Sequence, residues 1–190
     1  MAIRKFVEKQ TEESGSKDLL LLIRDILIAF AVIVVFLQFL GPTIVFESSM
    51  ENTMHENDYV FLAKKAYAFG GNVPERGDII VFRSELLDTS GTAKNLIKRV
   101  VGLPGETVEV HDGAVWIDGA RLDEPYTKEG ETLGEMAAVT VPEGSYFVMG
   151  DNRRVSADSR DPDIGCVPLD VFRGKVVFRL LPFSKIGPVH

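Results

Sequence analysis

Hydrophobic and polar positions divide the chain into one continuous apolar stretch near the N-terminus and a long region of short alternating runs. The apolar stretch covers residues 19–40, and its only charged residues are Arg24 and Asp25. A helix needs about 20 apolar residues to cross a bilayer, and two such charges are tolerated when they lie at the interface or pair with each other. The pattern therefore predicts a transmembrane helix over residues 19–40.

Two other interpretations of this stretch fit the sequence less well. A cleaved signal peptide has a shorter apolar core and a cleavage site of small residues, whereas this stretch runs into LGPTIVFE without an A-x-A pattern. A buried helix of a soluble protein is less favoured still, because this stretch is apolar on every face. We therefore expect an uncleaved anchor.

The charges that flank the apolar stretch predict its orientation. Residues 1–25 contain five Lys or Arg residues, and residues 41–60 contain none. The positive-inside rule then places the N-terminus in the cytoplasm. We expect a mobile cytoplasmic tail over residues 1–18 and an extracytoplasmic domain over residues 41–190 of a single-pass protein in the cell membrane.

The region beyond residue 40 has the pattern of a mainly β domain. Asp112-Gly113 lies between two alternating runs, which is a strong hairpin signal, and Asp118-Gly119 predicts a second turn. We expect loops over residues 84–95 and 126–138. The predicted strands lie within residues 44–46, 58–69, 76–83, 108–122, 145–150 and 174–183.

Composition narrows the class of protein further. The 190 residues are 45% hydrophobic, which suffices for one modest domain besides the anchor. A net charge of −7 argues against a nucleic-acid partner. Cys166 is the only cysteine, so it cannot form an internal disulfide, and we interpret it as a packing residue. No spacing of His, Cys and carboxylates typical of a metal site is present, and we expect neither a metal nor a cofactor.

A serine shortly after the apolar stretch is the first candidate for chemistry. Ser49 lies in ESSMENTM, nine positions after Leu40, and a serine hydroxyl needs a base to become a nucleophile. Histidine is the usual base, but His55 lies in a polar run, His111 is beside a hairpin turn and His190 is the last residue. There is no G-x-S-x-G motif either, so a histidine-based triad is disfavoured.

Lysine replaces histidine as a base when burial lowers its pKa from about 10.4. Lys98 lies in LIKRVVGL, where a strand would put it on the same face as Leu96 and Val100. The other interpretation is an edge strand from which Lys98 and Arg99 reach solvent. The local pattern alone leaves both interpretations open.

Four blocks in order resemble the type I signal peptidases, the membrane-bound Ser/Lys endopeptidases that remove signal peptides from exported proteins. The anchor and SSMENT are followed by RGDIIVF, by KRVVGLPGETVEV and by YFVMGDNRRVSADSRDPDIG. Together the blocks span nearly all of the chain beyond Leu40, with the short central span of the compact form of the family. This resemblance favours a buried Lys98.

The resemblance implies a role for each matched position. Ser49, before Met50, is similar to the nucleophile of the family, and Lys98 to its general base. Ser156 matches the serine that hydrogen-bonds the lysine amine. Asp158 and Arg160 match a pair that braces the site.

Further positions complete or depart from the family pattern. The turn at 150–153 is similar to the one that positions the last block, and the Ser49 N–H is expected to donate to the oxyanion. Asn52 and Met54 replace a proline and a leucine. Glu47 replaces a small residue, often a serine that donates to the oxyanion, and an ionised carboxylate only accepts. The adjacent Ser48 is the less favoured nucleophile.

The implied substrate is a preprotein whose cleavage site emerges from the membrane. Nine extended residues reach at most about 30 Å, so Ser49 stays near the bilayer. The resemblance implies an extended substrate with small side chains in shallow pockets, and we expect residues 44–46 and part of 78–82 to line them. Three alternatives remain: a peptidase dedicated to few substrates, a self-cleaving Ser/Lys protease, and a non-catalytic anchored β module.

Overall fold

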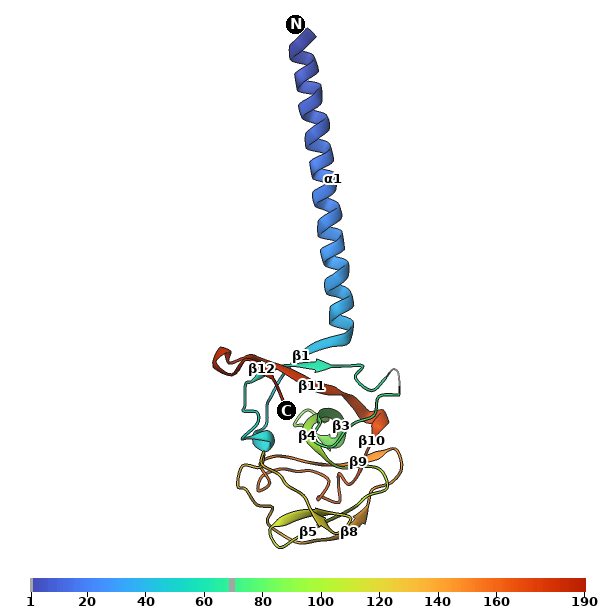
Figure 1. Ribbon diagram of the computed structural model, residues 1–190, viewed down its shortest axis with the longest axis vertical. Helices are drawn as coiled ribbons and strands as arrows, with labels where there is room; N and C mark the ends of the chain where they lie inside the picture. The colour runs from blue at the N-terminus through green and yellow to red at the C-terminus, as the bar shows by residue number, and fades with distance from the viewer. Residues whose placement is uncertain (1, 69–70) are drawn as a thin grey trace. The chain divides into compact units, whose positions relative to one another are not determined.

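The computed structural model describes the backbone of residues 2–68 and 71–190 and the side chains of residues 18–68 and 71–190. The chain consists of two units, a helical unit that ends at Phe39 and a second unit over Leu40–His190. Figure 1 shows the elements of both units.

The first unit is one helix, α1, over Ala2–Phe39. Its segment Asp18–Phe39 has 22 residues, is long and apolar enough to cross a membrane, and has no buried part. The helix therefore fits the predicted anchor, although its backbone also includes the residues expected to form a tail. It ends one residue earlier than predicted because Leu40 pairs within the first strand, and Pro42 disfavours a longer helix.

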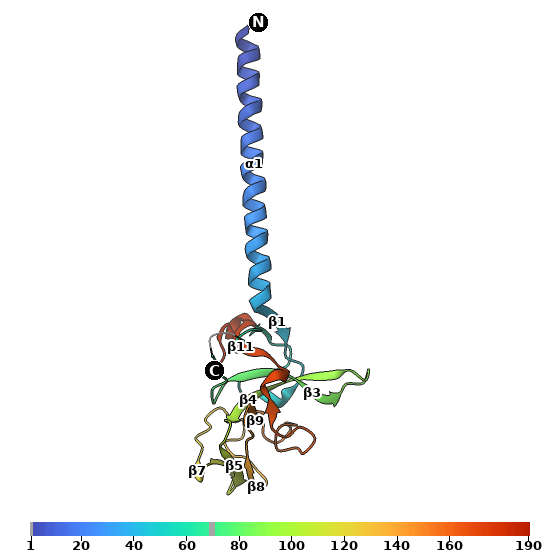
Figure 2. The same cartoon turned by 90° about the vertical axis from the view of Figure 1, so that its right-hand side faces the viewer.

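The second unit is built on an antiparallel sheet of eight strands (Figures 1 and 2). The strand order is β1-β2-β11-β3-β4-β9-β10, and β12 pairs with β11. The ladder places β4 between β3 and β9, in the interior of the sheet. Its strands are β1 (Leu40–Ile44), β2 (Tyr59–Ala63), β3 (Ile79–Leu87), β4 (Ala93–Gly102), β9 (Ser145–Met149), β10 (Val167–Pro168), β11 (Phe172–Leu181) and β12 (Gly187–Pro188).

A smaller antiparallel sheet lies between β4 and β9 in the sequence, with the strand order β7-β6-β5-β8. Its strands are β5 (Thr107–His111), β6 (Ala114–Ile117), β7 (Ala120–Arg121) and β8 (Met136–Thr140). Asp112 and Gly113 have φ angles of 51° and 71°, and Asp118 and Gly119 have 50° and 77°. Two consecutive left-handed residues are typical of tight hairpin turns, so both predicted turns are confirmed. Three short 3₁₀ turns complete the second unit: η1 (Ser48–Met50), η2 (Leu169–Val171) and η3 (Phe183–Lys185).

Several predicted boundaries are wrong. The strand expected at 44–46 ends at Ile44, and the strand expected at 58–69 ends at Ala63, with turns up to residue 68; residue 69 lies outside the described residues. The loop expected at 84–95 is only residues 88–92, because Leu87 pairs with Ala93. The loop expected at 126–138 ends where β8 begins, since β8 pairs with β5.

Buried side chains form three clusters, and one of them surrounds the segment that carries Ser49. Val45, Met50 and Met54 are at most 2% exposed and pack with Ile79 of β3. Full burial of a side chain of this size contributes about 1.5–3 kcal/mol. Apolar contacts with the core therefore fix the position of the segment that carries Ser49. Cys166 is half-buried against another cluster, as its packing interpretation predicts.

Candidate active site

Ser49 lies in the short 3₁₀ turn η1, and two kinds of contact fix the position of this turn. Glu51 donates its N–H to the carbonyl of Ser48 at 3.1 Å, which closes the turn from within. From the opposite side, Asn152 donates its backbone N–H to the carbonyl of Ser49 at 3.0 Å and its side-chain amide to the carbonyl of Ser48 at 3.1 Å. The nucleophile candidate is thus held by the turn at 150–153, a hundred residues further along the chain.

Lys98 lies opposite Ile80 in the interior of the large sheet, and its side chain is 0% exposed. Its Nζ is 2.8 Å from Ser49 Oγ and donates to the carbonyl of Ile97 at 3.1 Å. Ser49 itself is 6% exposed. The edge-strand interpretation is therefore wrong, and the two residues that the sequence singled out meet within hydrogen-bond distance.

The surroundings of Lys98 favour a neutral amine. Burial lowers the pKa of Lys98 from its ordinary value, and the carboxylates of Glu47, Asp158 and Asp151 oppose this shift in that order. Burial is the largest influence because the charged form loses its hydration in the packed interior. Asp151 and Asp158 each pair with an arginine, which weakens the attraction of their carboxylates for an ammonium.

A buried ion pair joins the strand of Lys98 to the turn that holds Ser49. Arg99 donates Nε to Asp151 Oδ1 at 2.9 Å and Nη2 to Oδ2 at 2.7 Å, and both side chains are at most 3% exposed. Thr53 donates its hydroxyl to Asp151 Oδ2 at 2.5 Å, and the Arg99 guanidinium lies 4.0 Å above the ring of Tyr126. Sequence reasoning assigned no role to Arg99 or Thr53. Both ends of the ion pair lie in matched blocks, Arg99 in KRVVGLPG and Asp151 in GDNR, which is the one signal that could have suggested the contact.

Asp158 and Arg160 form the predicted pair. Arg160 donates Nε to Asp158 Oδ1 at 2.8 Å and Nη2 to Oδ2 at 2.9 Å, and Asp158 Oδ2 also accepts the N–H of Gly150 at 3.0 Å. Arg160 reaches the carbonyl of Arg153 as well, at 2.8 Å. The pair is therefore bound to both ends of the turn at 150–153.

Ser156 does not make the predicted hydrogen bond to the Lys98 amine. Among the described residues, its buried Oγ has no hydrogen-bond partner. Its hydroxyl instead packs against Gly150, where an added Cβ would lie 2.3 Å from Ser156 Oγ and 2.5 Å from the Ser49 carbonyl oxygen. The Lys98 amine meets Ser49 Oγ and the Ile97 carbonyl instead.

A cleft of about 610 Å³ opens beside Ser49. One wall is the segment 43–47, and the other is formed by β4 with the turn that precedes it. Residues 44–46 and Val81 line the cleft, as predicted, and Phe46 is 77% exposed there. A cleft of mixed apolar and polar lining between an extended segment and a sheet accommodates an extended peptide.

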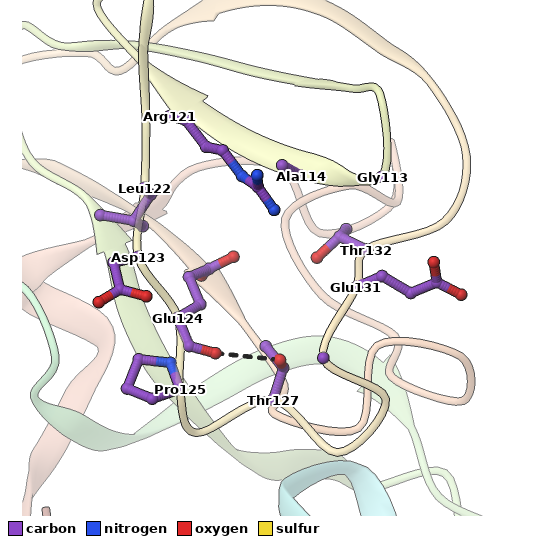
Figure 3. Close-up of a pocket in the computed structure, with 11 residues that line it drawn as sticks. Gly113, Ala114, Arg121, Leu122, Asp123, Glu124, Pro125, Thr127, Glu131 and Thr132 are labelled. Carbon is purple, nitrogen blue, oxygen red and sulfur yellow. Dashed lines mark hydrogen bonds between the residues drawn. The ribbon is translucent and has the colours of Figure 1, made fainter.

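A second cavity, of about 450 Å³, lies over the small sheet and is lined by neither Ser49 nor Lys98 (Figure 3). Thr127 donates its hydroxyl to the carbonyl of Glu124 at 3.0 Å on one side of this cavity. The Glu124 carboxylate pairs at 2.5 Å with Arg153. The Glu124–Arg153 pair therefore links one wall of this cavity to the turn at 150–153.

Comparison with known proteins shows which family the chain resembles over most of its length. The family described as "Signal peptidase, peptidase S26" matches residues 19–181. Signal peptidase I of Bacillus licheniformis is 35% identical over 191 residues, which cover 94% of this chain and 96% of that protein. Signal peptidase I T of Bacillus subtilis (strain 168) is 37% identical over 155 residues, 76% of each chain. A crystal structure of a signal peptidase I from Enterococcus faecalis V583 is 36% identical, with a TM-score of 0.45, and the match covers 55% of this chain and 97% of that one. The family match extends over most of the chain, which therefore belongs to the peptidase S26 family of signal peptidases.

Proposed function

We propose that this signal peptidase I is a serine endopeptidase with Ser49 as nucleophile and Lys98 as general base. The observation that carries the proposal is the 2.8 Å separation of Ser49 Oγ and Lys98 Nζ, with Lys98 0% exposed and Ser49 6% exposed. A base must lie within hydrogen-bond reach of the proton that it removes, and the burial of Lys98 favours the neutral amine that has a free lone pair.

The reaction is acyl transfer in two halves. Lys98 takes the hydroxyl proton while Ser49 Oγ attacks the carbonyl carbon before the scissile bond, and the Ser49 N–H donates to the oxyanion. The ammonium of Lys98 then returns the proton to the leaving amine, which departs as the new N-terminus. In the second half Lys98 deprotonates a water molecule, the hydroxide attacks the acyl-enzyme, and the proton goes back to Ser49.

The supporting residues act through the backbone around the dyad. We assign Asp158 and Arg160 the task of fixing the turn at 150–153, because they bind both of its ends. Ser156 packs against Gly150, and we assign it a positioning role on the Ser49 carbonyl in place of the expected role on the amine.

The substrates are preproteins at a membrane. We propose that a preprotein segment lies extended in the cleft beside residues 43–47 and gains affinity from main-chain pairing. The five basic residues within residues 1–25 and the absence of Lys and Arg over residues 41–60 support a cytoplasmic N-terminus and an extracytoplasmic catalytic unit (residues 41–190).

Cleavage of an added preprotein by the full chain in liposomes tests the dyad. Ser49→Ala and Lys98→Ala are each expected to reduce the rate by at least a thousandfold, since neither half of the reaction proceeds without both groups. Ser48→Ala is the matched control and should cleave at near the normal rate. Retained cleavage by Ser49→Ala, or equal losses in Ser48→Ala and Ser49→Ala, would refute the assignment. Because the preprotein is a separate chain, its cleavage also excludes a purely self-cleaving enzyme.

A further inference from the structure

Three charged residues line the cleft beside Ser49: Glu47, Asp88 and Lys94. The Asp88 carboxylate is engaged by its own turn, where it accepts the N–H groups of Ser90 at 2.8 Å and Thr92 at 2.9 Å. Glu47 faces Lys94 across the cleft, with 3.9 Å between Glu47 Oε1 and Lys94 Nζ. Once Lys98 is neutral, the cleft contains two carboxylates and one ammonium, and its net charge is negative.

We propose that Glu47 is a specificity-determining residue through which this enzyme favours preproteins with a Lys or Arg side chain close to the scissile bond. The proposal rests on the proposed signal peptidase function and narrows its substrate class. A substrate cation would replace Lys94 as the partner of Glu47, while a substrate carboxylate at the same place would meet a like charge.

The Glu47–Lys94 pair is weak, so replacing Lys94 with a substrate cation as the partner of Glu47 costs little free energy. The Glu47 and Lys94 side chains are 46% and 41% exposed, and 3.9 Å is long for an ion pair. Exposed pairs of this kind contribute little free energy. A peptide that fills the cleft excludes water, and the lower local dielectric strengthens the new pair relative to the one it replaces.

Glu47 also acts on the base itself. The charged groups near Lys98 are the carboxylates of Glu47, Asp158 and Asp151, and the latter two are each bound by an arginine. Among the residues whose side chains are described, Glu47 pairs only with Lys94, at 3.9 Å, so its charge is the least neutralised of the three. A substrate cation beside Glu47 would offset its attraction for a protonated amine, and the preference should therefore appear in kcat as well as in KM.

Peptide cleavage by the full chain in detergent micelles tests the proposal. The substrates are preprotein peptides that differ at one position among the six residues before the cut, where they contain Lys, Gln or Glu. For at least one position we expect kcat/KM to be about fivefold or more higher with Lys than with Glu, as a newly formed ion pair of about 1 kcal/mol allows. Glu47→Gln should reduce this ratio to less than about twofold.

Two further variants separate a local effect from a general one. Lys94→Gln removes the competing cation and should raise the Lys-to-Glu ratio above that of the unmodified enzyme. Glu143→Gln removes an exposed carboxylate that does not line the cleft and should leave the ratio unchanged. Equal ratios in the unmodified enzyme and Glu47→Gln, or no preference at any position while the Gln peptides are cleaved, would overturn the inference alone. Failure to cleave any peptide would overturn the proposed function with it.

Discussion

Replacement of the buried base should make the protein more stable while it abolishes cleavage. Lys98→Met keeps an unbranched side chain of similar size in a site that is 0% exposed and removes the amine. The ordinary pKa of 10.5 applies to the unfolded chain, whereas burial lowers the pKa of Lys98 in the fold. At pH 7 the amine must therefore lose its proton on folding, which costs about 5 kcal/mol if it is fully neutral in the fold.

The substitution also removes favourable contacts. Lys98 Nζ has two partners, Ser49 Oγ and the Ile97 carbonyl, and each hydrogen bond contributes about 1 kcal/mol. The net expectation for Lys98→Met is a gain of about 2–3 kcal/mol in the free energy of unfolding at pH 7.

The pH dependence of this gain is the diagnostic result. Because the pKa is lowered in the fold, the unfolded chain binds more protons between the two pKa values, and the stability of the unmodified protein rises with pH. At pH 9 the cost of deprotonation is only about 2 kcal/mol, so the gain from Lys98→Met should fall to near zero.

Urea unfolding of the full chain in detergent, followed by the fluorescence of Trp116, measures the gain in the free energy of unfolding and its change between pH 7 and pH 9. Trp116 is the only tryptophan, and it stacks on His111 at 4.7 Å in the small sheet, away from the substitution. Lys128→Met is the matched control, since Lys128 is 45% exposed and should show no such pH dependence. A Lys98→Met variant that is less stable at pH 7, or whose gain does not change between pH 7 and pH 9, would contradict a neutral buried amine.

Three further outcomes follow from the same contacts. The rate of peptide cleavage should fall with decreasing pH as Lys98 becomes charged. Glu47→Gln should move this loss to lower pH, because the Glu47 carboxylate favours the ammonium form of Lys98. An unchanged midpoint in the pH–rate profile would contradict this effect of Glu47. Asp151→Asn leaves a buried guanidinium without its carboxylate and should destabilise the fold by about 3–5 kcal/mol in urea unfolding, and a loss below 1 kcal/mol would show that the pair is not buried in solution. Gly150→Ala places a Cβ 2.5 Å from the Ser49 carbonyl oxygen and should reduce kcat at least tenfold with little change in KM; normal kcat would show that the turn adjusts freely.

The sequence predicted the contact between Ser49 and Lys98 better than it predicted the contacts around these two residues. Ser49 and Lys98 each lie in a short block with a distinctive pattern, and both blocks occur in the expected order. The environment of Arg99 depends on Asp151, 52 residues away, and no local pattern distinguishes a buried arginine from an exposed one. The position of the Ser156 hydroxyl depends on the close approach of Gly150, which is a property of the folded backbone.

The missed strands have a related physical cause. Three of the five residues of β8 are exposed, so the strand lacks the alternation of apolar and polar residues that signals a half-buried strand. The ends of β3 and β4 extend as a hairpin through a polar stretch whose pairing depends on the turn at Asp88. Turn chemistry and pairing partners, more than hydrophobicity, determine both elements.

The strand order has a consequence for the folding of the enzyme during its synthesis. β11, near the end of the chain, lies between β2 and β3. The turn η1, which carries Ser49, is held in place by Asn152, which binds the carbonyls of Ser48 and Ser49. A nascent chain that has emerged only as far as β4 therefore possesses both reactive groups but no scaffold that joins them. The peptidase should therefore be inactive during its own synthesis and become active only when β11 has paired with β2 and β3.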